Sequence, residues 1–237
     1  MVQTARCLAL VTGGGSGLGK ECALALLQRD MAVCTVARHA HSLGSPAADG
    51  GGRGSRLLSR VCDVSSAEAL AALRDNLTAE GFSVRWLLNI AGVGIFGPLT
   101  GLAPGSIREV LDSNLLGTIL TTREFLDDIV SNGGAICNVM STAALVGRPH
   151  ESAYVAAKWG ARGFTEALRV ELRGQPVRIM AVYPGGMRTS FWDRSPRHVD
   201  SARFMQPSDV ARVIVSNLLD PSPCQVSDLR IDRLHDG

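Results

Sequence analysis

Short runs of apolar residues alternate along the chain with longer stretches in which apolar residues recur every three or four positions. The short runs are typical of buried β-strands, and the longer stretches of helices with one apolar face. Strands are expected at Leu8–Val11, Ala32–Ala37, Leu57–Cys62, Val84–Ile90, Ala135–Met140, Val177–Val182 and Val226–Ile231. Helices are expected at Gly19–Gln28, Ser66–Ala79, Ser106–Ile129, Ala153–Leu172 and Ser208–Leu219.

The alternation of strand and helix favours a parallel sheet, because a helix between two strands carries the chain back to the same edge of the sheet. The strands are continuously apolar, which is typical of a sheet covered by helices on both faces. We therefore expect a Rossmann-type, doubly wound α/β fold of about seven parallel strands. A chain of 237 residues suits one such domain, covering residues 1–237, and is short for two.

Two stretches interrupt the alternation. His39–Ser55 is rich in glycine, alanine and serine, and it stands where a helix would normally join the second and third strands, so we expect a loop. Gly185–Met205 is long, has little periodicity and carries the aromatic residues Phe191, Trp192 and Phe204. Because a loop of this length in a compact domain is often functional, we expect it to be a substrate lid.

Composition excludes several classes of partner. The net charge of +2 gives no support for a nucleic-acid ligand, and no apolar run reaches the length of a membrane span. The six cysteines form no CxxC pair and are expected to be free thiols in a reducing compartment. His39 and His41 have no accompanying ligand set, so no metal is expected. We expect a cytoplasmic protein.

A glycine-rich turn follows the first expected strand and precedes the first helix. Glycine permits positive φ and close approach of the backbone, while a helix N-terminus offers free N–H groups and a favourable dipole to an anion. The turn is therefore predicted to hold the pyrophosphate of a dinucleotide. Its candidate residues are Gly13, Gly15, Ser16, Gly17, Leu18 and Gly19.

The end of the second strand indicates which dinucleotide binds. A site for NAD usually places a carboxylate there, but this chain has Ala37 followed by Arg38, with no carboxylate nearby in the sequence. A guanidinium can pair with the 2′-phosphate of NADP. Arg38 therefore favours NADP(H) over NAD(H), although an exposed surface arginine is the alternative.

Tyr154 and Lys158 are four residues apart at the start of an expected helix, so their side chains share one face. An ammonium beside a phenol favours the phenolate and lowers the pKa of the hydroxyl, which then can act as an acid or base near neutral pH. Ser141 ends an expected strand, where its hydroxyl could bond a substrate carbonyl. Asn114 lies inside an expected helix that asparagine disfavours, which suggests a further role.

These motifs, taken in order, resemble the short-chain dehydrogenase/reductase family over nearly the whole chain. The resemblance is carried by the glycine turn, Asp63-Val64, Asn89-Ile90-Ala91-Gly92, Asn114, Ser141, Tyr154, Lys158 and Pro184-Gly185 with Thr189. It implies an oxidoreductase that moves hydride between NADP(H) and a carbonyl or secondary alcohol, with the cofactor carrying the chemistry.

The resemblance also implies roles for individual residues. Tyr154 would be the general acid/base, Ser141 would orient the carbonyl, Lys158 would lower the pKa of the tyrosine and hold the nicotinamide ribose, and Asn114 would support a proton-relaying water. Residues expected at the cofactor besides the glycine turn, Arg38, Tyr154 and Lys158 are Asp63, Val64, Asn89, Ala91, Gly92, Pro184, Gly185, Met187 and Thr189. A homodimer or homotetramer is implied through the helices at 106–129 and 153–172.

The chain departs from the family pattern in two motifs. Ile90 replaces a second asparagine, so some hydrogen bonding around the central strand must be replaced or lost, and Met140 stands where a serine usually precedes the catalytic one. A non-catalytic NADP(H)-binding sensor of the same fold is the alternative function.

The identity of the substrate stays open among a small ketone, an acyl thioester, a sugar and a steroid-like compound. The expected lid offers aromatic rings to an apolar substrate. It also offers basic side chains to an anionic one: Arg188, Arg194, Arg197, His198 and Arg203.

Overall fold

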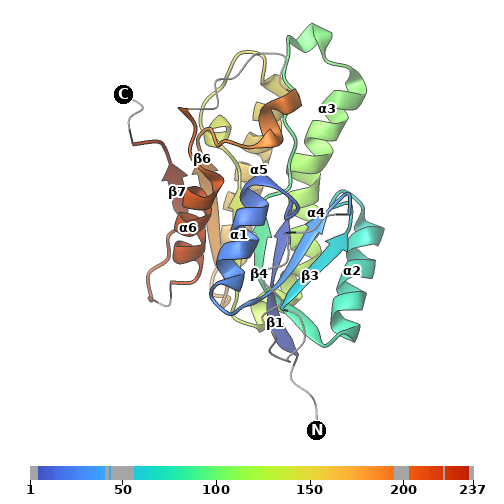
Figure 1. Ribbon diagram of the computed structural model, residues 1–237, viewed down its shortest axis with the longest axis vertical. Helices are drawn as coiled ribbons and strands as arrows, with labels where there is room; N and C mark the ends of the chain where they lie inside the picture. The colour runs from blue at the N-terminus through green and yellow to red at the C-terminus, as the bar shows by residue number, and fades with distance from the viewer. Residues whose placement is uncertain (1–4, 41–42, 44–55, 195–202, 221, 235–237) are drawn as a thin grey trace.

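The computed structural model describes residues 5–40, 43, 56–194, 203–220 and 222–234. Its centre is a seven-stranded sheet in the order β3-β2-β1-β4-β5-β6-β7, and each neighbouring pair of strands is parallel (Figure 1). The strands are β1 (Arg6–Thr12), β2 (Ala32–Ala37), β3 (Leu57–Val61), β4 (Phe82–Asn89), β5 (Ala135–Val139), β6 (Arg178–Pro184) and β7 (Asp228–Ile231). The expected doubly wound, Rossmann-type parallel sheet is confirmed.

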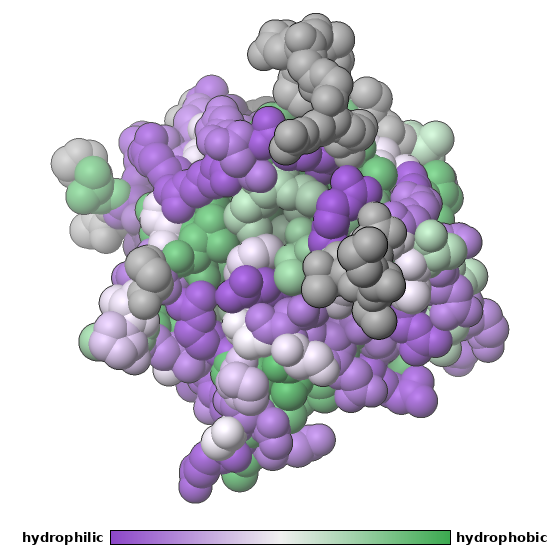
Figure 2. Space-filling model, turned by 90° about the horizontal axis from the view of Figure 1, so that it is seen from below, coloured by the Kyte–Doolittle hydropathy of each residue, from purple (hydrophilic) through white to green (hydrophobic). Residues whose placement is uncertain are grey.

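Helices cover both faces of the sheet. The helices are α1 (Gly17–Leu27), α2 (Ala67–Ala79), α3 (Pro104–Leu111), α4 (Gly117–Ser131), α5 (Ser152–Glu171) and α6 (Pro207–Leu218). Helices α1 and α6 pack on one face, and α2, α4 and α5 on the other. Seen from below, the side at which β1 begins, the surface is mainly hydrophilic, with hydrophobic side chains in patches (Figure 2).

Burial on both faces explains why the strands are apolar at consecutive positions. Leu8, Ala9, Leu10 and Val11 of β1 are all fully buried. Leu8 and Leu10 pack with the α2, α4 and α5 side of the sheet, whereas Ala9 and Val11 pack with α1 and α6. A strand with one face in water would have needed polar residues at every second position.

The expected helix Ser106–Ile129 is helical throughout, but it is not one uniform α-helix. Two α-helices, α3 and α4, are joined by a π-helical turn, Asp112–Leu116, which contains Asn114. A π-turn inserts one extra residue into a helix and is frequent at functional sites. The other expected helices and strands occur with ends displaced by two residues at most.

The two expected loops fall partly outside the described residues. Of His39–Ser55, only residues 39, 40 and 43 are described, so the expectation of a loop there stays a prediction. Of the expected lid, residues 195–202 are outside the described part, and residues 190–194 form a short 3₁₀ helix. Before and after this gap, Met187 and Met205 form a parallel bridge. No helix of the described part is long and apolar enough to span a membrane.

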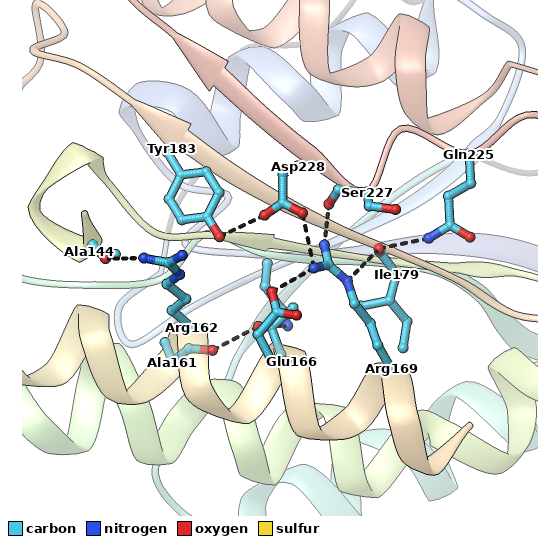
Figure 3. Close-up of polar contacts among 12 residues, drawn as sticks. Ala144, Ala161, Arg162, Glu166, Arg169, Ile179, Tyr183, Gln225, Ser227 and Asp228 are labelled. Atoms are coloured by element: carbon cyan, nitrogen blue, oxygen red, sulfur yellow. Dashed lines mark hydrogen bonds and ion pairs between the residues drawn. The ribbon is translucent and has the colours of Figure 1, made fainter. Parts of the chain in front are cut away.

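A polar cluster that sequence patterns did not indicate fastens the edge strand β7. The hydroxyl of Tyr183 in β6 donates a hydrogen bond of 2.8 Å to Asp228 Oδ1, and Arg169 of α5 forms an ion pair of 3.1 Å with Asp228 Oδ2 (Figure 3). Arg169 also donates to the carbonyls of Ile179 and Ser227. The cluster therefore joins α5, β6 and β7 along the length of β6.

Candidate active site

A cavity of about 360 Å³ opens at the carboxyl ends of the central strands. Parallel sheets of this type bind ligands there, because the strand order reverses and the connecting loops separate. Most residues predicted from the sequence line this cavity. They are Gly13, Ser16, Gly17, Leu18, Gly19, Arg38, Ala91, Gly92, Asn114, Ser141, Tyr154, Lys158, Pro184, Gly185, Met187 and Thr189.

The glycine turn is shaped by contacts that only glycine allows. Gly13 has a φ of +67°, and a Cβ there would lie 2.9 Å from the backbone of Ala91. A Cβ on Gly19 would lie 2.2 Å from the carbonyl oxygen of Gly13. The turn is thereby closed tightly against β4, and α1 begins in it at Gly17 with the N-terminus toward the cavity. This cradle fits the pyrophosphate of a dinucleotide.

The structure places Asn89 in the core rather than in the cavity wall. Its side-chain amide donates hydrogen bonds to Thr122 Oγ1 at 3.0 Å and to Asn138 Oδ1 at 2.9 Å. Asn138 in turn donates to Thr165 Oγ1 at 3.0 Å, which connects β4 and β5 to α4 and α5. Asn89 thus braces the sheet, and a direct contact with the cofactor is not supported by its position.

Thr12 supplies the hydrogen bonding that the isoleucine at position 90 puts in question. The hydroxyl oxygen of Thr12, at the end of β1, accepts from the backbone N–H of Ile90 at 3.0 Å and of Ala91 at 3.1 Å. The end of β4 is therefore held by the neighbouring strand, and no side-chain amide at position 90 is required.

Gly15, Asp63 and Val64 were also expected at the cofactor, and they do not line the cavity. Asp63 Oδ1 accepts hydrogen bonds from the backbone N–H and hydroxyl of Ser65, which hold the pKa of Asp63 below its usual value. Val64 is buried against Gly117, where a Cβ would lie 2.6 Å from its side chain. Asp63 keeps an exposed position near Arg38, whereas Val64 packs into the core.

Arg38 lines the cavity, but a carboxylate accompanies it. Its guanidinium lies 3.5 Å from Glu109 Oε1 of α3, and both side chains are partly exposed. The expectation that no carboxylate lies nearby holds only along the sequence, because Glu109 is separated from Arg38 by 71 positions. An anion at Arg38 must therefore compete with Glu109 for the guanidinium.

Tyr154, Ser141 and Lys158 converge at the inner end of the cavity. Ser141 follows β5, and its hydroxyl acts on the phenol of Tyr154 at the start of α5, where it favours the phenolate. One turn later, Lys158 Nζ lies 5.7 Å from the centroid of the tyrosine ring and donates to the carbonyl of Val139 at 3.3 Å. Tyr154 and Lys158 are 6% and 4% exposed, so the pair is held almost entirely out of water.

Burial dominates the ionisation of both groups. It raises the pKa of Tyr154 above the ordinary value, and the hydroxyl of Ser141 opposes this shift only in part. It lowers the pKa of Lys158 from 10.5 to about 8. Desolvation thus disfavours both charged forms, and Lys158 is not among the causes of the shift at Tyr154, so the expectation that Lys158 lowers the pKa of the tyrosine stays a prediction.

Asn114 directs an unbonded acceptor toward Lys158. Its amide nitrogen donates to the carbonyls of Val93 at 2.8 Å and Val110 at 2.9 Å, while Oδ1 is buried with no partner among the described residues. A Cβ on Gly92 would lie 2.3 Å from this oxygen and 3.6 Å from Lys158 Nζ. Asn114 Oδ1 and Lys158 Nζ therefore both border the space beside Gly92 without bonding each other, and a hydroxyl or water there could bridge them.

Several lining residues were not indicated by sequence patterns. Met140 had been noted only as a departure from the family pattern, and Arg148 and Glu151 lie in an irregular segment before α5 that has no periodicity. These residues reach the cavity because the chain turns back after β5, and a pattern along one segment contains no information about that turn. The remaining such residues are Ile90, Val93, Gly94, Val139, Gly186 and Ser190.

This combination of fold and site defines a dinucleotide-binding oxidoreductase, and comparison with known proteins agrees. Residues 7–200 match the model of the short chain dehydrogenase family. The chain therefore belongs to the short-chain dehydrogenase family.

Individual relatives cover nearly the whole chain. Carbonyl reductase family member 4 of Danio rerio is 30% identical over 219 residues, covering 90% of this chain and 92% of the relative. The solved alcohol dehydrogenase from the archaeon Thermococcus sibiricus, complexed with 5-hydroxy-NADP, has a TM-score of 0.85 at 25% identity and covers 98% of both chains. A short-chain dehydrogenase/reductase from Vibrio parahaemolyticus has a TM-score of 0.82 at 32% identity, covering 97% of this chain and 98% of that one.

The burial of Lys158 predicts a pH-dependent stability. Because its pKa is lowered from 10.5 to about 8, charging Lys158 costs free energy in the folded state below about pH 8, and this cost fades as the pH rises toward 10.5. Between about pH 8 and pH 9, wild type should gain about 1 kcal/mol of unfolding free energy relative to Lys158→Met. Urea unfolding at each pH measures the difference.

Lys20→Met is the matched control, because it removes a lysine on α1 that is only partly buried. An equal pH dependence in the two variants would contradict the assignment of the effect to Lys158.

Proposed function

We propose that the protein is an NADP(H)-dependent oxidoreductase that interconverts a carbonyl and a secondary alcohol, with Tyr154 as general acid/base. The carrying observation is that Asn114, Ser141, Tyr154 and Lys158 line one cavity together with the glycine turn. A structural role alone would not require a buried phenol, a buried ammonium and an unbonded amide oxygen at one ligand-sized opening.

The proposed reaction follows from the positions of these side chains. Bound NADPH would supply the hydride that reaches the carbonyl carbon. Ser141 would hold the carbonyl oxygen, and Tyr154, which lines the same cavity, would give its proton to that oxygen as charge develops there. In the oxidation direction the phenolate of Tyr154 would take the proton from the alcohol.

Lys158 and Asn114 would serve the tyrosine rather than the substrate. A pKa of about 8 lets Lys158 gain and lose a proton near neutral pH, and the free Oδ1 of Asn114 lies beside its ammonium. Together they form a route by which the proton of Tyr154 can be replaced. The ammonium of Lys158 and Oδ1 of Asn114 would also offer a donor and an acceptor to the ribose hydroxyls of a bound cofactor.

Tyr154→Phe tests the assignment of the acid/base. The variant should bind NADPH within about threefold of wild type, while kcat/KM for reduction of a carbonyl falls by about 10²–10⁴-fold, since only the proton donor is removed. Fluorescence titration measures binding, and NADPH absorbance measures turnover.

Tyr183→Phe is the matched control, because Tyr183 is the other tyrosine of the chain and bonds Asp228 outside the cavity. A non-catalytic sensor would be indicated if wild type bound NADPH but reduced no member of a broad panel of aldehydes and ketones.

The preference for NADP(H) is proposed from Arg38, which lines the cavity beyond the glycine turn. A 2′-phosphate would replace Glu109 as the partner of the guanidinium. The NADP derivative bound by the Thermococcus sibiricus relative is consistent with this proposal.

Substitution of each member of this ion pair gives opposite results. Arg38→Ala should raise the KM for NADPH about 10-fold or more and leave that for NADH within about twofold, because a charged hydrogen bond to phosphate is lost. Glu109→Gln should lower the KM for NADPH about two- to fivefold, because the competing partly exposed carboxylate is neutralised. A preference of wild type for NADH would refute the role of Arg38.

The outer face of α5 supports association with a second copy. Exposed apolar or small residues recur along one side of this helix, and Trp159 and Val170 are 47% and 63% exposed. Leu116, next to α4, is 39% exposed. A homodimer would cover these groups, as the family resemblance also implies.

Trp159→Glu should convert the protein to a monomer, because the partner face would have to desolvate a carboxylate. Light scattering after gel filtration gives the mass. Val213→Glu, on α6 and the opposite face of the sheet, is the control and should leave the mass unchanged. A monomeric wild type would contradict the proposed homodimer.

A further inference from the structure

Four aromatic rings gather beside the phenol of Tyr154. Phe191 lies 5.6 Å from the tyrosine ring and Phe96 lies 5.5 Å from it, centroid to centroid. Trp192 contacts both phenylalanines, and Phe204 contacts Trp192 at 5.3 Å. Phe191 and Trp192 line the cavity directly, and Phe96 supports them from behind.

The rings are fixed by contacts with the backbone. A Cβ on Gly94 would lie 2.5 Å from Phe191 Cζ and 2.6 Å from Phe96 Cζ, so the absence of a side chain at position 94 lets both rings meet there. The indole N–H of Trp192 donates to the carbonyl of Met187 at 3.0 Å. Phe96, Phe191, Trp192 and Phe204 together form an aromatic wall of the cavity. This hydrogen bond and the edge-on ring contacts give the aromatic wall a defined shape.

Two arginines of the expected lid that the structure describes do not share this wall. Arg188 and Arg203 are exposed and do not line the cavity. Arg148 does line it, but its guanidinium donates to Thr142 Oγ1 at 2.6 Å. Glu151 lines the cavity as well and acts on the phenol of Tyr154 together with Arg148. Around the aromatic rings the lining is largely apolar, with Val93, Met140, Met187, Phe191 and Trp192.

We infer that the substrate carbonyl carries a flat apolar group, aryl or alicyclic, and that Phe191 and Trp192 select it. This inference rests on the proposed carbonyl reduction. An aromatic group gains edge-to-face contacts with the wall, whereas each sugar-like hydroxyl loses its hydrogen bonds to water and finds few partners. The structure thereby favours an aryl ketone over a ketose or a charged acyl thioester.

Four carbonyl compounds of known structure test the inference with the wild-type enzyme and NADPH. They are 1-phenylpropane-1,2-dione, butane-2,3-dione, erythrulose and acetoacetyl-coenzyme A. The kcat/KM for the phenyl dione should exceed that for butanedione by about 10-fold or more, and that for erythrulose by about 100-fold or more.

Substitutions of two glycines on the same loop test whether the substrate preference depends on the aromatic wall or on any change in this loop. Gly94→Ala should displace Phe96 and Phe191 and reduce the ratio of phenyl dione to butanedione at least about fivefold. Gly97→Ala is the matched control, since a Cβ there meets only Leu102 at 3.5 Å, and its ratio should equal that of wild type. Phe191→Leu removes the ring without adding bulk, and it should lower the ratio in the same way if Gly94→Ala does not fold.

The outcomes distinguish this inference from the proposed function. If butanedione is reduced and erythrulose or acetoacetyl-coenzyme A is used as well as the phenyl dione, the aromatic selection is refuted and the carbonyl reduction stands. The selection is also refuted if Phe191→Leu leaves the ratio unchanged. If no carbonyl is reduced although NADPH binds, the proposed function fails and this inference fails with it.

Discussion

The close approach of the ends of β1 and β4 is the constraint on which the site depends. The hydroxyl oxygen of Thr12 accepts hydrogen bonds from two backbone N–H groups at the end of β4. The next residue, Gly13, lies so close to the backbone of Ala91 that a side-chain methyl group on it would not fit. This contact directs the start of α1 and the loop after β4 toward the same space. The glycine cradle and Gly92, which makes room for Asn114 Oδ1, are consequences of one backbone junction.

The fold and most of the cavity could be predicted from the sequence because both faces of the sheet are buried. Apolar strands and periodic helices alternate along most of the described part, with the connection between β2 and β3 as an exception, and strand ends in such a sheet converge. The polar residues at those ends, such as Ser141 and Thr189, could therefore be assigned to one site. The sequence did not predict which residues from distant segments of the chain lie next to the predicted site residues. Glu109 beside Arg38, and the apolar surroundings of Tyr154, involve segments far apart in the chain.

The same limit applies to the ionisation of Tyr154 and Lys158. The spacing of Tyr154 and Lys158 indicated that the two side chains share a face, which is correct, but spacing says nothing about water. The structure surrounds both groups with protein, and desolvation then acts on the phenol and the ammonium in the direction that keeps each neutral. Charging either group therefore costs free energy, and a ligand that brings an opposite charge or hydrogen bonds to this point can offset part of that cost.

The π-helical turn between α3 and α4 has a consequence for how this region can vary. One extra residue in the turn rotates every following position by about 100° relative to an uninterrupted α-helix. The buried positions of α4 are therefore shifted by one residue from those that a continuation of α3 would bury. Asn114 lies where this shift occurs, and its amide donates to the carbonyls of Val93 and Val110. Loss of a single residue between positions 112 and 116 would leave a smoother helix with an ordinary hydrogen-bond ladder. It would also turn either the asparagine or the core side of α4 away from its partners, so the length of this segment is as constrained as its composition.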